Sequence, residues 1–470
     1  MNEYVFKSMK LSNVLNSFKK GIKHIFSPTS DLDAAIDKLG LEPEIVRSLH
    51  LILASNIMGM TCGTICNVGS NPMIGLANDL GAGDLVFGIL NAVPQIAVLL
   101  QIPVSMLVNY THKRKKYLLT FGVAARILWL IIGFIPFLIP ERIADYRLWA
   151  VLVLAGTSSA LGSFIQVSWF PWLGDLTPPS IRGLWFSAKD AIGSVVSIIL
   201  GLSVGFAMDN LPSPMRYAIL FGIGSVSGIL DLSLYAFCKE VYSSPPVKPE
   251  LRSWGKGIFS NKQFNLFLVF WTLWNFSANF AGSYLNRYSV NELGLTFTQL
   301  TLFGSIVANI VTMVASRAWS HLVIRYGFKP VLWITAIFTS LSQLLFLLAK
   351  PNAVWPIMLY YGIGSAFWCA CNAIASQLQL TLTDNQNRTG SLAVFSCVTS
   401  ILGTSLGIMT GGSMLETFSG MTLPFSLNRY QAIIIIGVTI RFTSALLCLP
   451  KFKNDRSFTV SGMIRDIIRQ

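Results

Sequence analysis

Amide and indole side chains gather in four long apolar segments of this chain. They are Asn56 and Asn67 within 48–76, Gln166 and Trp169 within 147–173, Trp274, Asn275 and Asn279 within 264–290, and Trp368 and Asn372 within 353–380. An amide offers both a hydrogen-bond donor and an acceptor, and an indole ring covers apolar surface. The set therefore suits an uncharged or zwitterionic polar organic molecule. The alternative is that these side chains bind one another across packed helices.

Acidic side chains, which can bind a proton or a sodium ion, are scarce within the apolar segments. Only Asp190 and Asp231 lie well inside them. Arg126 lies at a depth comparable to that of Asp231, so we expect a buried Arg126–Asp231 ion pair rather than proton binding at Asp231. Asp190 follows Lys189 and lies within two turns of a loop, which favours gating or pairing with a basic loop residue.

The composition requires a surface that faces lipid. Of the 470 residues, 53% are hydrophobic and only 12% are charged, whereas a soluble domain carries roughly 25% charged residues. The mean hydropathy is +0.59. We predict an all-α integral membrane protein with 12 transmembrane helices. They lie at about 48–76, 83–108, 117–139, 147–173, 184–208, 215–238, 264–290, 297–322, 329–349, 353–380, 391–414 and 428–450.

Three sequence landmarks recur about 210 residues apart. Asn78–Gly81 returns as Asn291–Gly294, Asp175–Arg182 returns in weaker form as Thr381–Arg388, and the pair Gly201 and Gly205 returns as Gly407 and Gly411. A direct repeat of six membrane helices predicts two pseudo-symmetric six-helix bundles, related by an axis along the membrane normal. Because lipid offers no hydrophobic gain for helix association, we expect the glycines to allow close packing where the bundles slide.

The expected organisation has five parts. They are a cytosolic tail at 1–46 that contains an amphipathic helix, a bundle at 47–238, a proline-broken linker at 239–262, a bundle at 263–450 and a tail at 451–470. With the first helix running outward, 27 Lys and Arg residues lie on the inner side and 6 on the outer side. This positive-inside pattern places both termini in the cytosol, and the membrane is a plasma or bacterial inner membrane. It also accounts for the net charge of +14 without nucleic-acid binding.

Two loops, after the second and the eighth predicted helix, carry related basic motifs. Their residues are Asn109, Lys113, Arg114, Arg325, Gly327 and Lys329. At both places the chain resembles the major facilitator superfamily, whose loops there read G-x-L-A-D-R-x-G-R-K. Asp175 and Arg182, with Arg388 in the second copy, resemble that family's loop between helices four and five. The resemblance covers residues 48–450 and implies a gating role for these loop residues, with Arg182 able to pair with Asp175.

The resemblance implies a transporter with its cargo site near the bilayer midplane between the bundles. In the family that site lies on helices one, four, seven and ten, the four segments that carry the amide and indole residues. The implied partners are a small-molecule solute and membrane lipid, with a co-transported proton or sodium ion and facilitated diffusion as open alternatives. We expect a monomer that needs no cofactor or metal and is not an enzyme. A transporter-like sensor or scaffold without net transport is the other function considered.

Overall fold

The computed structural model contains two helical bundles. It describes residues 36–111, 113–241, 261–351, 353–382, 388–421, 423–424, 427–453, 462–463 and 465–466. Within these residues, eleven helices are long and apolar enough to cross a membrane. The helix α12 (Lys262–Gly282) has 21 residues and occupies the remaining position of the repeat. The predicted amphipathic helix of the N-terminal tail and most of the linker lie outside the described residues.

The first bundle holds the first six spans. Its helices are α3 (Pro43–Ile65), α4 (Asn71–Asp79), α5 (Asp84–Ala97), α6 (Gln101–Thr111), α7 (Arg114–Leu138), α8 (Asp145–Leu176), α9 (Pro179–Asn210) and α10 (Met215–Tyr235). The helices α5 and α6 are joined by a short 3₁₀ turn at Val98–Leu100 and together form one span.

The second bundle repeats this order. After α12 come α13 (Leu285–Asn291), α14 (Phe297–Thr301), α15 (Ala308–Tyr326), α16 (Phe328–Ser342), α17 (Trp355–Leu382), α18 (Arg388–Val398), α19 (Leu406–Thr417) and α20 (Arg429–Cys448). One π-helical turn, Leu302–Val307, joins α14 to α15, and another, Thr399–Ser405, joins α18 to α19.

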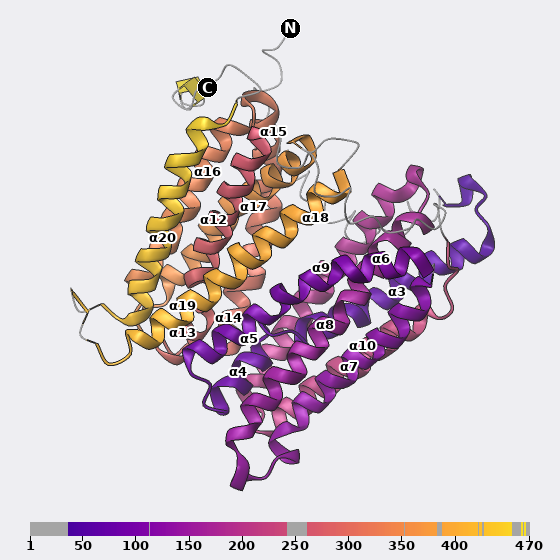
Figure 1. The fold of residues 1–470 in the computed structure, drawn as a ribbon, viewed down its shortest axis with the longest axis horizontal. Coiled ribbons are helices and arrows are strands. Elements are labelled where there is room, and N and C mark those ends of the chain that lie inside the picture. Colours follow the sequence, from indigo (N-terminus) through magenta and orange to yellow (C-terminus); the bar gives the residue numbers. More distant parts are fainter. Residues whose placement is uncertain are drawn as a thin grey trace, which may run out of the picture.

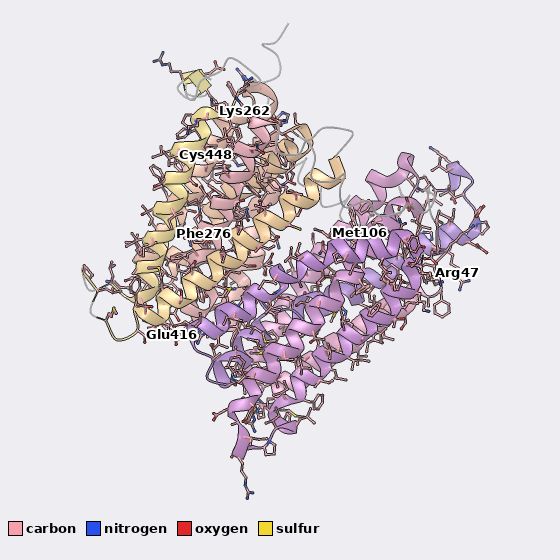
Figure 2. The ribbon with its side chains drawn as sticks, viewed as in Figure 1. Arg47, Met106, Lys262, Phe276, Glu416 and Cys448 are labelled. Atoms are coloured by element: carbon pink, nitrogen blue, oxygen red, sulfur yellow. The ribbon has the colours of Figure 1, made fainter. Side chains whose placement is uncertain are left out.

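The two bundles meet at one end and separate at the other (Figure 1). At the joined ends, α5 packs against α19 and α9 packs against α14. The helices α6 and α18 lie where the bundles diverge. Figure 2 places Glu416 at the joined ends, and Lys262 at the far end of the second bundle. We call the side where the bundles meet, near Glu416, the joined face, and the side where they diverge, near α6 and α18, the open face.

The first and seventh spans are each broken in their last third, whereas the sequence led us to expect continuous helices at 48–76 and 264–290. Residues 66–70 separate α3 from α4, and Ser283 and Tyr284 separate α12 from α13. Helix α4 restarts with Ser70 as its N-cap, whose hydroxyl accepts a hydrogen bond from the Met73 amide at 3.4 Å. Breaks of this kind leave backbone groups free to line a cavity within a membrane protein.

The repeated glycines pack at two different kinds of interface. A Cβ at Gly201 would lie 2.9 Å from Thr301, and a Cβ at Gly205 would lie 3.0 Å from Thr298. Both contacts join α9 to the second bundle, as expected. A Cβ at Gly407 or Gly411 would instead meet the backbone of α12, at 2.4 and 2.0 Å. This second pair therefore holds α19 against its own bundle, and the expectation of a sliding contact there is wrong.

On α19, the residue that packs closely against the other bundle is Gly412. A Cβ at this position would lie 2.9 Å from the Asp84 carbonyl oxygen and 3.3 Å from Leu85 Cα, both on α5. The close approach is one residue further along the helix than the repeat predicts. The symmetry of the sequence therefore identifies the helix that meets the other bundle, but not the face of it that does so.

Candidate substrate cavity and its gate

The largest of three neighbouring cavities, about 450 Å³, lies between the bundles. From the first bundle, Asn67, Asn91 and Arg126 line it, and from the second Asn279 and Thr404 do. Asn67 lies in the break of the first span, where its amide oxygen accepts from the Gly69 amide at 2.9 Å. The broken backbone therefore forms part of the polar wall.

A second cavity of about 370 Å³ also has walls from both bundles. It is lined by Thr64 and Asn71 from the first bundle and by Asn286, Thr301 and Tyr361 from the second. Asn71 donates a hydrogen bond to the Thr301 hydroxyl across the seam at 3.0 Å, and Tyr361 donates to Asn286 at 2.9 Å.

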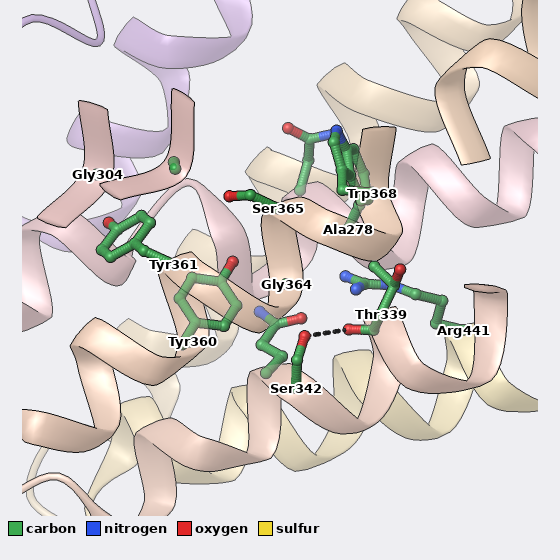
Figure 3. A pocket seen from close by; sticks show the side chains of 13 residues that line it. Ala278, Gly304, Thr339, Ser342, Tyr360, Tyr361, Gly364, Ser365, Trp368 and Arg441 are labelled. Atoms are coloured by element: carbon green, nitrogen blue, oxygen red, sulfur yellow. Dashed lines mark hydrogen bonds between the residues drawn. The ribbon is translucent and has the colours of Figure 1, made fainter. Parts of the chain in front are cut away.

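A third cavity, about 320 Å³, is formed within the second bundle. Gln343, Tyr360, Trp368 and Arg441 line it, together with Asn279, which also lines the largest cavity. Figure 3 shows Arg441 on one side of this cavity and Tyr361 on the opposite side. Shared lining residues link the three cavities into one polar region around the centre of the molecule.

Three of the predicted cavity residues line these cavities, namely Asn67, Asn279 and Trp368. Six do not. Asn56 donates to the Lys189 carbonyl at 3.1 Å, and Trp169 donates to the Tyr235 hydroxyl at 2.6 Å. Asn275 donates to the Trp271 carbonyl in its own helix, and Trp274 stacks on Trp368 with ring centroids 6.0 Å apart. Gln166 and Asn372 are exposed outside the three cavities. Asn56 and Trp169 thus bind neighbouring helices, but their partners are not other members of the predicted set.

Several cavity residues were not identified from the sequence. They are Asn91, Gln95, Ser158, Asn286, Gln343, Tyr360, Tyr361 and Arg441. Gln343 and Arg441 were the most accessible to sequence reasoning, since a polar group in a membrane span marks a functional site by default. They lie on the ninth and twelfth spans, outside the four segments to which the resemblance directed attention.

Arg126 and Asp231 lie near enough to interact electrostatically, but no hydrogen bond or ion pair joins them. Asp231 Oδ2 lies 3.0 Å from a Cβ built at Gly59, and Arg126 Cδ lies 2.9 Å from one built at Gly228. Within the described part of the chain, Arg126 Nε has no hydrogen-bond partner, and Arg126 lines the largest cavity. The expected Arg126–Asp231 ion pair is therefore not formed in this conformation.

Asp84 closes the joined face. Its carboxylate, only 5% exposed, lies 2.7 Å from Arg429 Nη1 and 3.6 Å from Arg287 Nε, both in the second bundle. Tyr430 donates to the same carboxylate at 3.2 Å. Arg287 also donates to the carbonyls of Ala82 and Gly83, so the cation binds both the charge and the backbone of the opposite bundle.

A second contact across the joined face caps a helix. Asp209, at the end of α9, accepts hydrogen bonds from the amides of Phe297 and Thr298 at 2.9 Å each and from the Thr298 hydroxyl at 2.6 Å. Thr296 and Gln299 form a capping box at the same helix start. The carboxylate of one bundle therefore satisfies the free amides and the positive dipole end of a helix in the other.

The loops of the open face are held within each bundle. Arg114 Nη1 lies 2.5 Å from Asp175 Oδ2, and Arg325 Nη2 lies 2.9 Å from Asp466 Oδ2. Lys329 donates to the carbonyls of Pro450 and Phe452 at 2.9 and 2.6 Å. These contacts join Arg114 to the end of α8, and Arg325 and Lys329 to the segment that follows α20.

The other loop residues differ in how far the structure describes them. Gly327 has a φ of 86°, which explains a glycine between α15 and α16. Lys113 is exposed at the start of α7. The side chains of Asn109, Arg182, Asp190 and Arg388 lie outside the described ones, so the expected pairing of Arg182 with Asp175 stays a prediction.

Two membrane-spanning bundles that enclose a polar cavity, closed at one face by contacts between them, define a membrane transporter. The sequence model of the Major Facilitator Superfamily matches residues 51–408. The chain belongs to this superfamily, as the loop motifs predicted, and is a transporter of small solutes rather than an enzyme. A comparison with curated protein sequences gives no significant match.

Solved structures of transporters share this fold. The nucleoside transporter NupG matches with a TM-score of 0.62 and 14% identity, covering 88% of this chain and 100% of that one. A bacterial homologue of the iron transporter ferroportin, in an inward-facing state, gives 0.62 and 15%, covering 86% and 99%. The xylose transporter XylE from E. coli, in an inward open conformation, gives 0.59 and 15%, covering 88% and 99%. At such identities the likeness establishes the fold, and the all-α, two-bundle prediction is confirmed.

Proposed function

We propose that the chain is a secondary active or facilitative transporter that carries a small polar organic solute by alternating access. The observation that carries this proposal is a polar cavity whose walls belong to two bundles. Asp84 and Asp209 join the bundles at the joined face, and no ion pair between described residues joins the bundles at the open face. Breaking these contacts and forming others at the open face would expose the same cavity to the other side of the membrane. Asn67, Asn279 and Trp368 are the predicted residues best placed to contact the solute.

The orientation follows from the distribution of charge. The loops of the open face, with Arg114, Arg325 and Lys329, belong to the side that carries 27 of the Lys and Arg residues in the assignment above, which favours the cytosol. We therefore propose that this structure is open to the cytosol and closed to the outside of a plasma or bacterial inner membrane. The division into bundles at 47–238 and 263–450 fits the same arrangement. Because one chain completes the cavity, a monomer surrounded by lipid suffices.

Counterflow in proteoliposomes tests the transport step. Vesicles loaded with unlabelled solute should accumulate labelled solute transiently, because a carrier exchanges the two while a sensor or scaffold only binds. Sugars, amino acids, nucleosides and organic acids form the panel. Binding without counterflow for every bound solute would favour the sensor or scaffold.

A reversible cross-link tests alternating access itself. Asn78 and Asn291 face each other across the joined face with 2.9 Å between their amide groups. Asn78→Cys combined with Asn291→Cys should allow a disulfide that stops counterflow, and a reductant should restore it. Each single cysteine variant serves as the control. Full counterflow with the disulfide formed would contradict alternating access.

A further inference from the structure

Arg441 carries a buried charge that lacks an acidic partner among the described residues. It is 3% exposed. Its Nε and Nη2 donate to the hydroxyl and carbonyl oxygens of Ser277 at 3.4 and 3.3 Å, and its guanidinium lies 5.4 Å from the centre of the Trp274 ring. These partners are neutral, whereas a guanidinium has five donors and a full charge. A buried charge is normally paired, because desolvation alone is strongly unfavourable.

Gln343 is unpartnered in the same cavity. The residue is 1% exposed, and neither its amide oxygen nor its amide nitrogen has a hydrogen-bond partner in the described part of the chain. It lines the 320 Å³ cavity together with Arg441 and Tyr360. The neighbouring Ser342 hydroxyl donates to the Thr339 carbonyl at 2.8 Å (Figure 3). Two buried polar side chains, one of them cationic, thus border one space with unused hydrogen-bonding capacity.

The charge of the whole polar region has one sign. Arg126 and Arg441 are the charged residues that line the three cavities, and no carboxylate occurs among the described lining residues. Asp231 acts on Arg126 from outside the lining, whereas the described part of the chain gives Arg441 no comparable neighbour. In a site of low dielectric, this arrangement attracts an anion and repels a cation.

We infer that the solute carries an anionic group, a carboxylate or a phosphate, that binds Arg441 beside Gln343. This inference rests on the proposed transport function and narrows the class of solute. A planar guanidinium forms paired hydrogen bonds with either anion. The Gln343 amide nitrogen supplies a further donor, and its oxygen accepts from a hydroxyl or a protonated group of the solute. Asn279, shared with the largest cavity, lies on the path between the bundles. The anionic or zwitterionic solute replaces the uncharged one that the amide residues alone suggested.

Matched solutes test the requirement for charge. The probes are lactate with lactamide, benzoate with benzamide, and glucose 6-phosphate with glucose, so that carboxylate and phosphate are compared separately with uncharged analogues. Their dissociation constants come from the rise in melting temperature of the purified full chain, since a ligand of the folded form stabilises it. At least one anion should bind more tightly than its neutral partner. Arg441→Gln should raise the dissociation constant of that anion roughly 10- to 100-fold and leave that of the neutral analogue unchanged.

Two further variants control for charge and fold. Arg441→Lys should retain part of the anion binding, because it keeps the charge and loses the planar fork. Arg142→Gln removes an exposed arginine outside the cavities and should change nothing. Without any probe, Arg441→Gln should melt at a higher temperature than the wild-type chain, because it removes a buried charge that lacks a counter-ion. If no probe binds, the inference is tested by the melting temperatures of Arg441→Gln and the wild-type chain alone. A lower melting temperature of Arg441→Gln would then overturn the inference.

The two proposals fail in different ways. Neutral analogues that bind as tightly as the anions, or an anion affinity unaffected by Arg441→Gln, would overturn the anionic solute. Counterflow of glucose without anion binding would do the same and leave transport intact. Anion binding that depends on Arg441 but gives no counterflow would sustain the site and remove transport.

Discussion

Asn78 and Asn291 occupy the same position in the two copies of the repeat and hydrogen-bond to each other, with Asn78 Nδ2 2.9 Å from Asn291 Oδ1. The reciprocal donor lies at 3.5 Å. Residues related by a two-fold axis meet themselves only where the axis passes between them. The pseudo-symmetry axis therefore runs through the joined face, where Asp84 and Asp209 also join the two bundles.

Loss of the Asp84 carboxylate should open the joined face. Asp84→Asn leaves the largely buried Arg287 without its anion and leaves Arg429 with Glu292, 3.8 Å away. Breaking a buried ion pair costs about 3–5 kcal/mol. That cost applies only to the joined state. A cysteine placed in the largest cavity by Ser283→Cys should therefore react faster in the Asp84→Asn variant than in the chain that keeps Asp84, when an impermeant thiol reagent is applied at the joined face. Arg142→Gln is the matched control, and an unchanged rate in the Asp84 variant would contradict the assigned gate.

Two glycine variants should separate folding from bundle movement. A Cβ at Gly411 would lie 2.0 Å from the Phe280 carbonyl oxygen within one bundle, whereas one at Gly205 would lie 3.0 Å from Thr298 Cα across the seam. Overpacking costs about 1–3 kcal/mol. Gly411→Ala should therefore lower the melting temperature, while Gly205→Ala should mainly increase thiol access from the joined face.

Gly63→Ala is the control for both glycine variants, because a Cβ at Gly63 meets nothing within 4 Å. It should leave the melting temperature and the thiol reactivity close to wild type. Equal effects of Gly411→Ala and Gly205→Ala on both measurements would show that the two contacts are not distinct.

The sequence predicted the fold more fully than the site. Hydropathy and the repeat identify two bundles, because lipid exposure and helix length leave few alternatives. The break at 66–70 and the approach at Gly412 depend on packing between distant helices. Among the site residues, Asn67, Asn279 and Trp368 were found by type and segment. Gln343 and Arg441 were missed because they lie on the ninth and twelfth spans, outside the four segments to which the resemblance directed attention.

Acidification should weaken the contact that Asp79 makes at the end of α4. Burial raises the pKa of this carboxyl, but hydrogen bonds from Tyr217, Ser213 and Arg216, at 2.6, 2.7 and 2.8 Å, outweigh burial and hold its pKa below the usual value. A lowered folded-state pKa contributes stability above the unfolded pKa of about 3.9, and that stability is lost as the pH falls through the folded value.

The melting temperature of the wild type should therefore fall more steeply below about pH 4 than that of Asp79→Asn. Near neutral pH the Asn variant should be the less stable protein, because it loses the charge that Arg216 binds. Glu141→Gln, an exposed residue of the same face, is the control. Parallel curves for the wild type and Asp79→Asn would exclude this contribution.

Removal of the Asp209 cap should destabilise the joined state rather than the fold. Its carboxylate accepts from the amides of Phe297 and Thr298 in the other bundle, and loss of a helix cap costs about 1–2 kcal/mol. Asp209→Ala should raise the thiol reactivity of Ser283→Cys from the joined face about 5- to 30-fold. Asp209→Asn keeps one acceptor and loses the charge at the helix dipole, so its effect should be smaller. A lower melting temperature with unchanged reactivity would instead place the role of Asp209 within its own bundle.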